Sequence, residues 1–198
     1  SDTGYKFSSA QAGDHDELHE LVQGKGTYTS DISVPGQLHA CFVRSPWAHA
    51  RIRSVDVHAA RHAQGVHAVV TGADVAKAGL GPVMPLVVLK GSNGENMHCS
   101  GMPILALEVV RHVGEPVVLV VAETLEQAMN AAEKVTIDYE PLACVTDLQA
   151  AIEQGAPQVQ AAVPGNVAMD WSLGQSPALE AAFAKAHHVQ EIELADPM

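Results

Sequence analysis

The pattern of apolar and polar positions is clearest in the stretch Arg111 to Thr124, RHVGEPVVLVVAET. Six consecutive apolar residues, 117 to 122, follow a Gly-Glu-Pro turn and lead into a helix start. An unbroken apolar run of this length, bounded by turn residues, is typical of a strand that is buried on both faces. The pattern therefore predicts a central strand in a layered α/β domain.

The residues after this run predict a helix and then a second strand. Thr124 and Gln127 have the spacing of a capping box, and a stripe at helical spacing is expected to face the core: Leu125, Ala128, Met129 and Ala132. In the segment 135 to 140, Val135, Ile137 and Tyr139 alternate with polar residues, as in a half-buried strand. The order strand, helix, strand predicts a crossover between neighbouring parallel strands.

Shorter elements precede this unit. Segments 38–43, 50–57 and 66–72 have strand character, and residues 58–64 form a short helical turn that Gly65 closes. In the first of these strands, Leu38, Ala40 and Phe42 share the face expected to be half-buried. Residues 79–103 are rich in Gly, Pro, Asn and Ser and predict a long loop, of the kind that is often functional or docks on a neighbour. Extended structure is expected to resume over 103–110.

The two ends of the chain differ from its middle in polarity and in predicted secondary structure. A short helix is predicted over Asp14–Val22, in a polar arm of residues 1–23. At the other end, a capped helix is predicted over 146–154, before Gly155, and residues 156–174 are predicted to form a connector. Ser176 is predicted to cap a helix over 177–186, and residues 188–194 predict a strand without a partner. We place a domain boundary near Cys144 and expect the chain to be part of a longer protein.

Composition and charge exclude several classes of partner. The chain of 198 residues has 11 Lys and Arg against 23 Asp and Glu, and its formal net charge of −12 disfavours nucleic acid and anionic membrane surfaces. No window reaches the roughly 20 apolar residues of a membrane span, and the N-terminal stretch lacks the pattern of an export signal. These features predict a soluble cytoplasmic protein without nucleic-acid binding or membrane insertion.

The candidate chemical groups are few. Cys41, Cys99 and Cys144 form no C-x-x-C pair, so an Fe–S site or a disulfide framework built by this chain is not expected; Cys41 and Cys144 are predicted to be buried and Cys99 accessible. His15 and His19 have the i, i+4 spacing of zinc proteases, but Asp16 replaces the required Glu. We therefore expect a solvated helix there.

Glu115 is the remaining candidate, because it lies at the mouth of the predicted central strand. Pro116 restricts its backbone to an extended conformation, and Gly114 can adopt an unusual dihedral angle, so a turn accounts for all three residues. We expect its carboxylate to accept backbone N–H groups or to pair with Arg111 and not to catalyse a reaction.

Several stretches together resemble one family. They are GKGTYTSDISVPGQLHACFVRSPWAHARIRSVD, GVHAVVTGAD, RHVGEPVVLVVAETLEQAMNAAEKVTIDYEPLACVTDLQAAI and PGNVAMDWSLG, which together span residues 24 to 174. Their order and spacing are similar to the N-terminal part of the molybdopterin-binding large subunit of the xanthine dehydrogenase, aldehyde oxidase and carbon monoxide dehydrogenase family. The matching positions form a structural signature: Arg44, Ser45, Pro46, His49, Ala50, Arg51, Gly114, Glu115 and Pro116.

The resemblance implies an α+β fold in three parts: an arm over 1–23, an α/β hammerhead domain over 24–143, and over 144–198 a linker with the first elements of the molybdenum-cofactor domain. It also implies a parent oxidoreductase that hydroxylates an aldehyde, an N-heterocycle or a similar substrate with water-derived oxygen. Electrons would pass to Fe–S clusters and then to flavin or another acceptor.

The family's cofactor-contacting segments and catalytic Glu lie beyond the matched region, so no catalytic, cofactor-binding or metal-binding residue is assigned to this chain. Molybdopterin, Fe–S clusters and an optional FAD are implied for the parent enzyme only. The implied partners are the remainder of the large subunit, an Fe–S small subunit and an optional FAD subunit. The chain alone is expected to be inactive.

Two hypotheses from other classes remain open at this point. The chain could be a stand-alone, non-catalytic binding or assembly module that uses the same fold. It could also be a metal-dependent hydrolase that uses His15 and His19.

Overall fold

The computed structural model describes residues 20–174 and 176–192, and it divides the chain into two units, Ser1–Gln37 and Leu38–Met198. In the first unit, residues 20–22 are helical and a 3-10 turn, η1, spans Thr29–Asp31. The rest of the helix predicted over Asp14–Val22, with His15 and His19, lies outside the described residues. All the sheets belong to the second unit.

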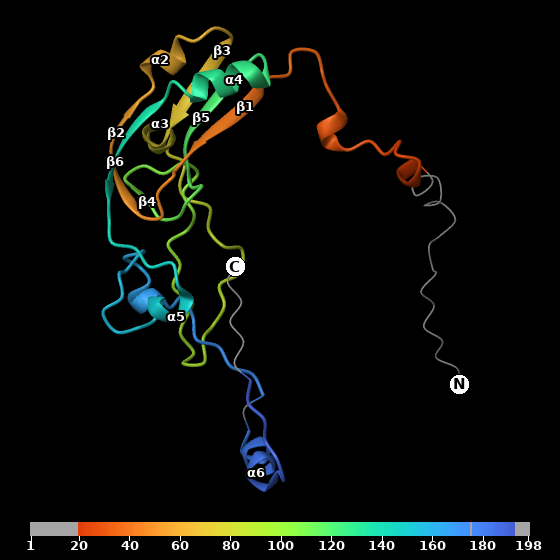
Figure 1. Cartoon of the computed structure of the whole chain (residues 1–198), viewed down its shortest axis with the longest axis vertical. Coiled ribbons are helices and arrows are strands. Elements are labelled where there is room, and N and C mark those ends of the chain that lie inside the picture. Colours follow the sequence, from red (N-terminus) through yellow and green to blue (C-terminus); the bar gives the residue numbers. More distant parts are fainter. Residues whose placement is uncertain (1–19, 175, 193–198) are drawn as a thin grey trace. The chain divides into compact units, whose positions relative to one another are not determined.

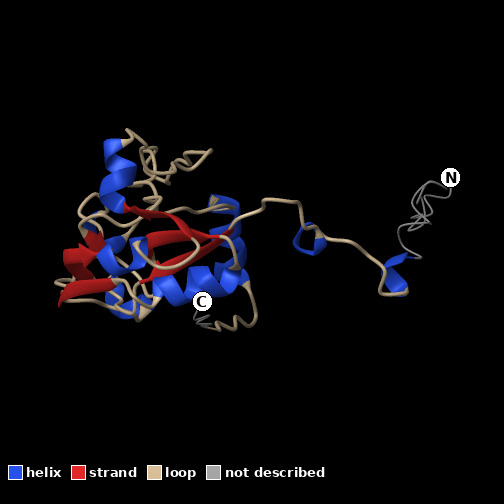
Figure 2. Cartoon of the chain, turned by 90° about the horizontal axis from the view of Figure 1, so that it is seen from above, coloured by secondary structure: helices blue, strands red, loops and turns tan. Residues whose placement is uncertain are grey.

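Two three-stranded antiparallel sheets organise the second unit (Figure 1). The first has the order β1-β5-β3, with bounds His39–Arg44, Pro116–Ala122 and Val66–Thr71; the second has the order β4-β2-β6, with bounds Val109–Val110, Ala50–Asp56 and Thr136–Pro141. Short helices and long loops connect the strands (Figure 2). The sequence therefore predicted most of the strands; the exceptions are the segment 103–110, of which only the last two residues pair, and the segment 188–194.

The predicted parallel crossover is wrong. β5 and β6 are joined by helix α4, Leu125–Ala132, as expected, but they belong to different sheets, and every pairing is antiparallel. β6 pairs instead with β2, a strand more than 80 positions earlier in the chain. Strand periodicity specifies that a strand forms and not which partner it takes, so this error came from reading adjacency in sequence as adjacency in space.

β5 is the central strand that its composition predicts. Val117, Val118, Val120 and Ala122 have no exposed surface, and β1 and β3 flank the strand on its two edges. α4 packs across this sheet (Figure 1). The core extends from there to β2 and β4 through Ala50 and Val110.

The face predicted for β1 is reversed, and the face predicted for α4 is confirmed only in part, at Ala128 and Ala132. On β1 the half-buried residues are His39, Cys41 and Val43, which alternate with exposed Ala40 and Phe42. These half-buried residues lie opposite Ala122, Val120 and Val118 of β5, on the face that α4 covers.

On α4 the fully buried residues are Ala128 and Ala131, whereas Leu125 and Met129 are each 51% exposed. Small side chains allow the helix to approach the sheet closely, and the larger residues are left at the flank. The predicted cap is confirmed, since the Thr124 hydroxyl accepts a hydrogen bond from the Gln127 N–H and the Gln127 side chain bonds back.

One helix was not predicted. α3, Gly72–Lys77, follows β3 directly and starts with a capping box in which Thr71 and Asp74 bond reciprocally. The Thr71 backbone N–H and hydroxyl, together with the nearby Arg61 guanidinium, lower the pKa of Asp74 below 3.8. The signal was present as Thr-x-x-Asp, but the strand pattern that overlaps it obscured it.

The remaining elements follow their sequence signals in part. α2 spans His58–Arg61 and ends near Gly65, which has a φ of +75°. α5, Leu148–Ala151, is shorter than predicted, and η2 spans Pro164–Asn166. α6, Pro177–Lys185, has its predicted Ser176 cap.

The strand predicted over 188–194 does not form in its described part, residues 188–192, where no partner strand is available. Among the described residues, no helix has the length and apolar character needed to cross a membrane.

Candidate functional site

The buried polar residues of the described chain come from the two signature segments. Ser45, His49 and Glu115 are 2%, 9% and 4% exposed, and the hydroxyl oxygen of Tyr139 is also buried. We call these four residues the buried polar cluster. Buried polar groups are costly unless they are hydrogen-bonded, so their partners indicate what the cluster does.

Backbone hydrogen bonds join the turn after β1 to the turn before β5. The Ser45 N–H donates to the Glu115 carbonyl at 2.9 Å, and the Gly114 N–H donates to the Ser45 carbonyl at 2.8 Å. Arg44 adds a hydrogen bond from Nη1 to the Gly114 carbonyl, at 2.8 Å. Gly114 has a φ of +86°, which explains the need for glycine in this turn.

The Glu115 carboxylate has a structural role. Its Oε2 accepts a hydrogen bond from the Arg111 backbone N–H, and its Oε1 lies 4.0 Å from Arg111 Nη1. Both contacts match the prediction from sequence. Because the residue is buried and its oxygens face the turn, it holds the entry to β5 in place.

Tyr139 brings the second sheet into the cluster. Its hydroxyl oxygen has no hydrogen-bond partner among the described residues. Burial raises the pKa of Tyr139 above 10.0, the Ser45 hydroxyl opposes this shift, and the negative charge of Glu115 adds to it. The Ser45 hydroxyl makes its own hydrogen bonds to the Trp47 backbone, both at 3.0 Å. The sequence suggested only that Tyr139 faces the core.

His49 ties the end of β6 to the start of β2. Its Nδ1 lies 2.7 Å from the Ala143 carbonyl, and its own carbonyl accepts a hydrogen bond from the Leu142 N–H at 3.0 Å. The hydrogen bonds of the buried polar cluster thus hold the β1 and β5 turns of the first sheet together, fix the turn between β4 and β5, and tie the start of β2 to the segment that follows β6. The cluster exposes no nucleophile or acid to a substrate, and its chemistry is that of a structural joint.

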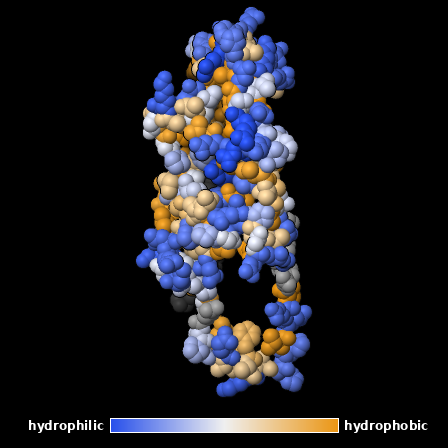
Figure 3. Space-filling view, turned by 90° about the vertical axis from the view of Figure 1, so that its left-hand side faces the viewer, coloured by the Kyte–Doolittle hydropathy of each residue, from blue (hydrophilic) through white to orange (hydrophobic). Residues whose placement is uncertain are grey.

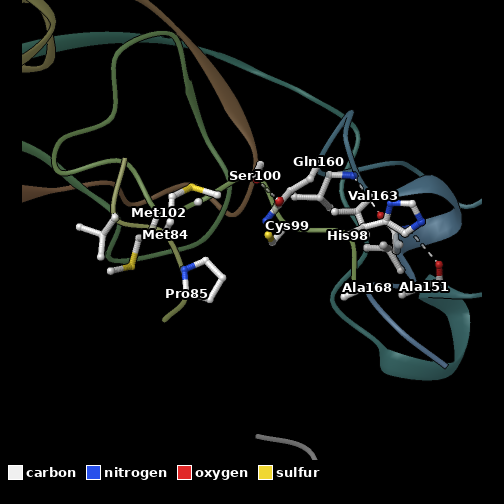
Figure 4. A pocket seen from close by; sticks show the side chains of 15 residues that line it. Met84, Pro85, His98, Cys99, Ser100, Met102, Ala151, Gln160, Val163 and Ala168 are labelled. Carbon is white, nitrogen blue, oxygen red and sulfur yellow. Dashed lines mark hydrogen bonds between the residues drawn. The ribbon is translucent and has the colours of Figure 1, made fainter. Parts of the chain in front are cut away.

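A cavity of about 600 Å³ lies between the long loop and the connector that follows β6 (Figure 4). Met84, Pro85 and Met102 line one part of it, and Val163, Ala151 and Ala168 line another, with His98, Cys99, Ser100 and Gln160 among the polar groups. The loop and the connector are hydrogen-bonded to each other. The His98 N–H donates to the Ala168 carbonyl and the Ser92 N–H to the Asp170 carbonyl, each at 2.8 Å, and the Ser100 hydroxyl donates to Gln160 Oε1.

Asn166 fixes the connector wall of this cavity. It is the non-glycine residue with a positive φ, +59°, in the described chain, and its side chain bonds to three backbone groups, of Val159, Ala151 and Pro157, at 2.9 to 3.1 Å. Asparagine tolerates this conformation better than most residues. The sequence predicted only a connector over 156–174, and nothing in it indicated these distant partners.

The cavity has no evident catalytic or metal-binding arrangement. No group of three His, Cys, Asp or Glu side chains in the described residues could hold a metal ion. The three cysteines are free; Cys41 and Cys99 are partly buried, and Cys144 is exposed, which contradicts the prediction of a buried Cys144. Its exposure follows from its place after β6, where the chain leaves the sheet.

Comparisons with known proteins identify the fold. Residues 23–143 match the family model described as aldehyde oxidase and xanthine dehydrogenase, a/b hammerhead domain. The chain is 43% identical over 171 residues to the nicotine 6-hydroxylase large subunit of Paenarthrobacter nicotinovorans, an alignment that covers 85% of this chain and 20% of that protein. It is 35% identical over 183 residues to the carbon monoxide dehydrogenase large chain of Afipia carboxidovorans, with 86% and 21% covered.

Solved structures show the same similarity. Quinoline 2-oxidoreductase from Pseudomonas putida 86 superposes with a TM-score of 0.69 at 37% identity, covering 77% of this chain and 18% of that one. Aldehyde oxidoreductase from Desulfovibrio gigas gives a TM-score of 0.59 at 29% identity, with 73% and 16% covered. The chain spans about a fifth of the length of the curated relatives named above.

Proposed function

The chain belongs to the aldehyde oxidase and xanthine dehydrogenase family, whose a/b hammerhead domain it contains, and from this we propose that it is the N-terminal structural domain of a molybdenum hydroxylase large subunit. The family expected from the sequence is thereby confirmed. The observation that carries the proposal is the buried polar cluster. Ser45 and Glu115 take part in hydrogen bonds that hold the turns at β1 and β5, His49 takes part in hydrogen bonds that hold β2 to the end of β6, and all three residues are buried from solvent.

For the parent enzyme we propose the hydroxylation of an aldehyde, an N-heterocycle or a similar substrate. The relatives that support this are named for nicotine, quinoline and aldehyde chemistry, and one for carbon monoxide. The reaction would insert water-derived oxygen at a molybdenum cofactor and pass electrons to Fe–S clusters, with flavin or another acceptor after them.

The cofactor itself does not suit the cavity described above. Molybdopterin carries a phosphate group, and phosphates in proteins are bound by Arg, Lys or clustered backbone N–H groups. The lining of the cavity contains neither Lys nor Arg. We therefore propose that the cofactor is held by the rest of the large subunit and that this domain supports it without contact through that cavity.

The proposed partners are the remainder of the large subunit, an Fe–S small subunit and an optional FAD subunit. Their support is that relatives are named as large subunits or chains and as a complex subunit. The proposed bounds stay 1–23 for the arm, 24–143 for the hammerhead domain and 144–198 for the linker with the start of the cofactor domain. The family match, which ends at residue 143, supports the second boundary. The cytoplasmic location stays a prediction.

The size of the native polypeptide tests the proposal. An antibody against this chain should detect, in the source cells, a polypeptide several-fold larger than 20.8 kDa. The purified chain should contain no molybdenum by mass spectrometry and should not oxidise aldehydes or N-heterocycles. A native band at the size of the chain would instead favour a stand-alone binding module, and activity of the chain alone would contradict the structural role.

A further inference from the structure

The sheet β1-β5-β3 is covered by α4 on one face, and its other face is apolar. The strand register places two rows of directly opposed residues on this second face: Ala40, Val121 and Ala68 in one row, and Phe42, Leu119 and Val70 in the other. We call these six residues the open face. Residues opposite each other in antiparallel strands point to the same side of a sheet, so the six side chains form one continuous apolar patch.

The open face is accessible to solvent in this structure. Phe42 is 43% exposed, Ala40 and Ala68 are exposed, and Leu119 and Val121 are only partly buried although β5 is the central strand. On the opposite face of the same strand, Val118 and Val120 have no exposed surface. β5 therefore has the composition of a strand buried on both faces; on the side of the open face the chain covers Val117 but leaves Leu119 and Val121 partly exposed. Figure 3, which views the molecule from the left-hand side of Figure 1, shows hydrophobic groups interspersed with hydrophilic ones on that side.

We propose that the open face is the surface on which a later part of the same large-subunit polypeptide packs. This inference rests on the proposed function, because it requires the chain to be part of a longer protein. The relatives provide ample polypeptide for this role, since the chain covers only 20% and 21% of the length of the two described above.

The small area of the open face selects a covalently linked partner over a separate one. With strands about 4.8 Å apart and same-face residues about 6.7 Å apart along a strand, six residues occupy roughly 200 Å². A stable complex of separate chains buries about 800 Å² on each partner. A segment of the same polypeptide has a high effective concentration, so a patch of this size is sufficient to hold it.

The open face has an apolar interior, and the charged side chain of Arg44 lies at its rim. The two rows contain no charged residue, and the guanidinium of Arg44 lies 5.3 Å from the centre of the Phe42 ring. This cation–π contact, with the hydrogen bond from Arg44 to the Gly114 carbonyl, restrains both side chains. Phe42 is thus positioned as a fixed contact at the edge of the patch.

Hydroxyl-radical footprinting of Phe42 tests the inference without altering the sequence. The oxidation rate of Phe42 should be high in the 198-residue chain and several-fold lower in the native polypeptide. Equal rates in the two would overturn the proposal. Slow oxidation of Phe42 in the isolated 198-residue chain would also overturn the proposal. If that slow oxidation became fast on dilution, the occupant would be a second copy of the chain. If it did not depend on concentration, the occupant would be the N-terminal arm.

A pair of matched variants adds a second readout. Phe42→Glu and Leu125→Glu each place a carboxylate at a half-exposed apolar position, the first on the open face and the second on the flank of α4. Both should leave the Tm of the isolated chain nearly unchanged, and only Phe42→Glu should lower the Tm of the native polypeptide. No effect of Phe42→Glu there, or equal losses from both variants, would overturn the assignment to this face. A native polypeptide no longer than this chain would refute the proposed function itself. Failure of the proposed function can therefore be told apart from failure of the open-face proposal.

Discussion

Removal of the Glu115 carboxylate tests whether the buried polar cluster is a structural joint. In Glu115→Ala the Arg111 backbone N–H loses its acceptor in a site where the carboxylate was 4% exposed. Leaving a buried N–H unsatisfied costs about 1–3 kcal/mol. The ion pair with the Arg111 side chain adds little, because the distance is 4.0 Å and the guanidinium side is 36% exposed. We therefore expect the free energy of unfolding to fall by about 1–3 kcal/mol.

Urea denaturation followed by circular dichroism measures this loss. For a chain of this size, 1 kcal/mol corresponds to a shift in Tm of about 2–4 °C, so thermal unfolding provides a second estimate. Glu115→Gln keeps an oxygen that can accept the same hydrogen bond and should lose less than Glu115→Ala. Glu123→Ala serves as the control, since Glu123 is exposed and its contact with His67 is 3.7 Å long. If Glu115→Ala were as stable as Glu123→Ala, the structural reading of the cluster would be refuted.

Three further outcomes are expected. Thr124→Ala removes the α4 cap and should lower the free energy of unfolding by about 0.5–2 kcal/mol in urea titrations. Val120→Ala should cost roughly 1.5–3 kcal/mol, and clearly more than Val121→Ala on the opposite, partly exposed face of β5, in the isolated chain. The pKa of Tyr139 is raised in the folded chain, so the stability linked to its neutral form is complete below about pH 10 and is lost as the pH rises through the folded pKa. Absorbance at the phenolate band should show this late titration. Tyr139→Phe should abolish the late titration without loss of stability at neutral pH, because the hydroxyl has no hydrogen-bond partner among the described residues.

The candidate site was predictable only in part. The turn role of Glu115 followed from its neighbours Gly114 and Pro116, because a proline restricts the residue before it and a glycine admits a positive φ. The contribution of Tyr139 did not follow, because a buried hydroxyl is recognised by what surrounds it in space. The same is true of Asn166, whose three bonds reach across the connector to residues up to 15 positions away.

The sequence by itself determined the local features of this protein. An apolar run specified a buried β5, and short hydrogen-bonding patterns specified the caps of α4 and α6, because these depend on residues within a few positions of each other. Only the tertiary structure decided that β5 and β6 belong to different sheets and that β1 turns Cys41, and not Phe42, toward α4. Such choices depend on which distant segments meet, and a strand that is apolar on both faces is compatible with either orientation of its neighbours.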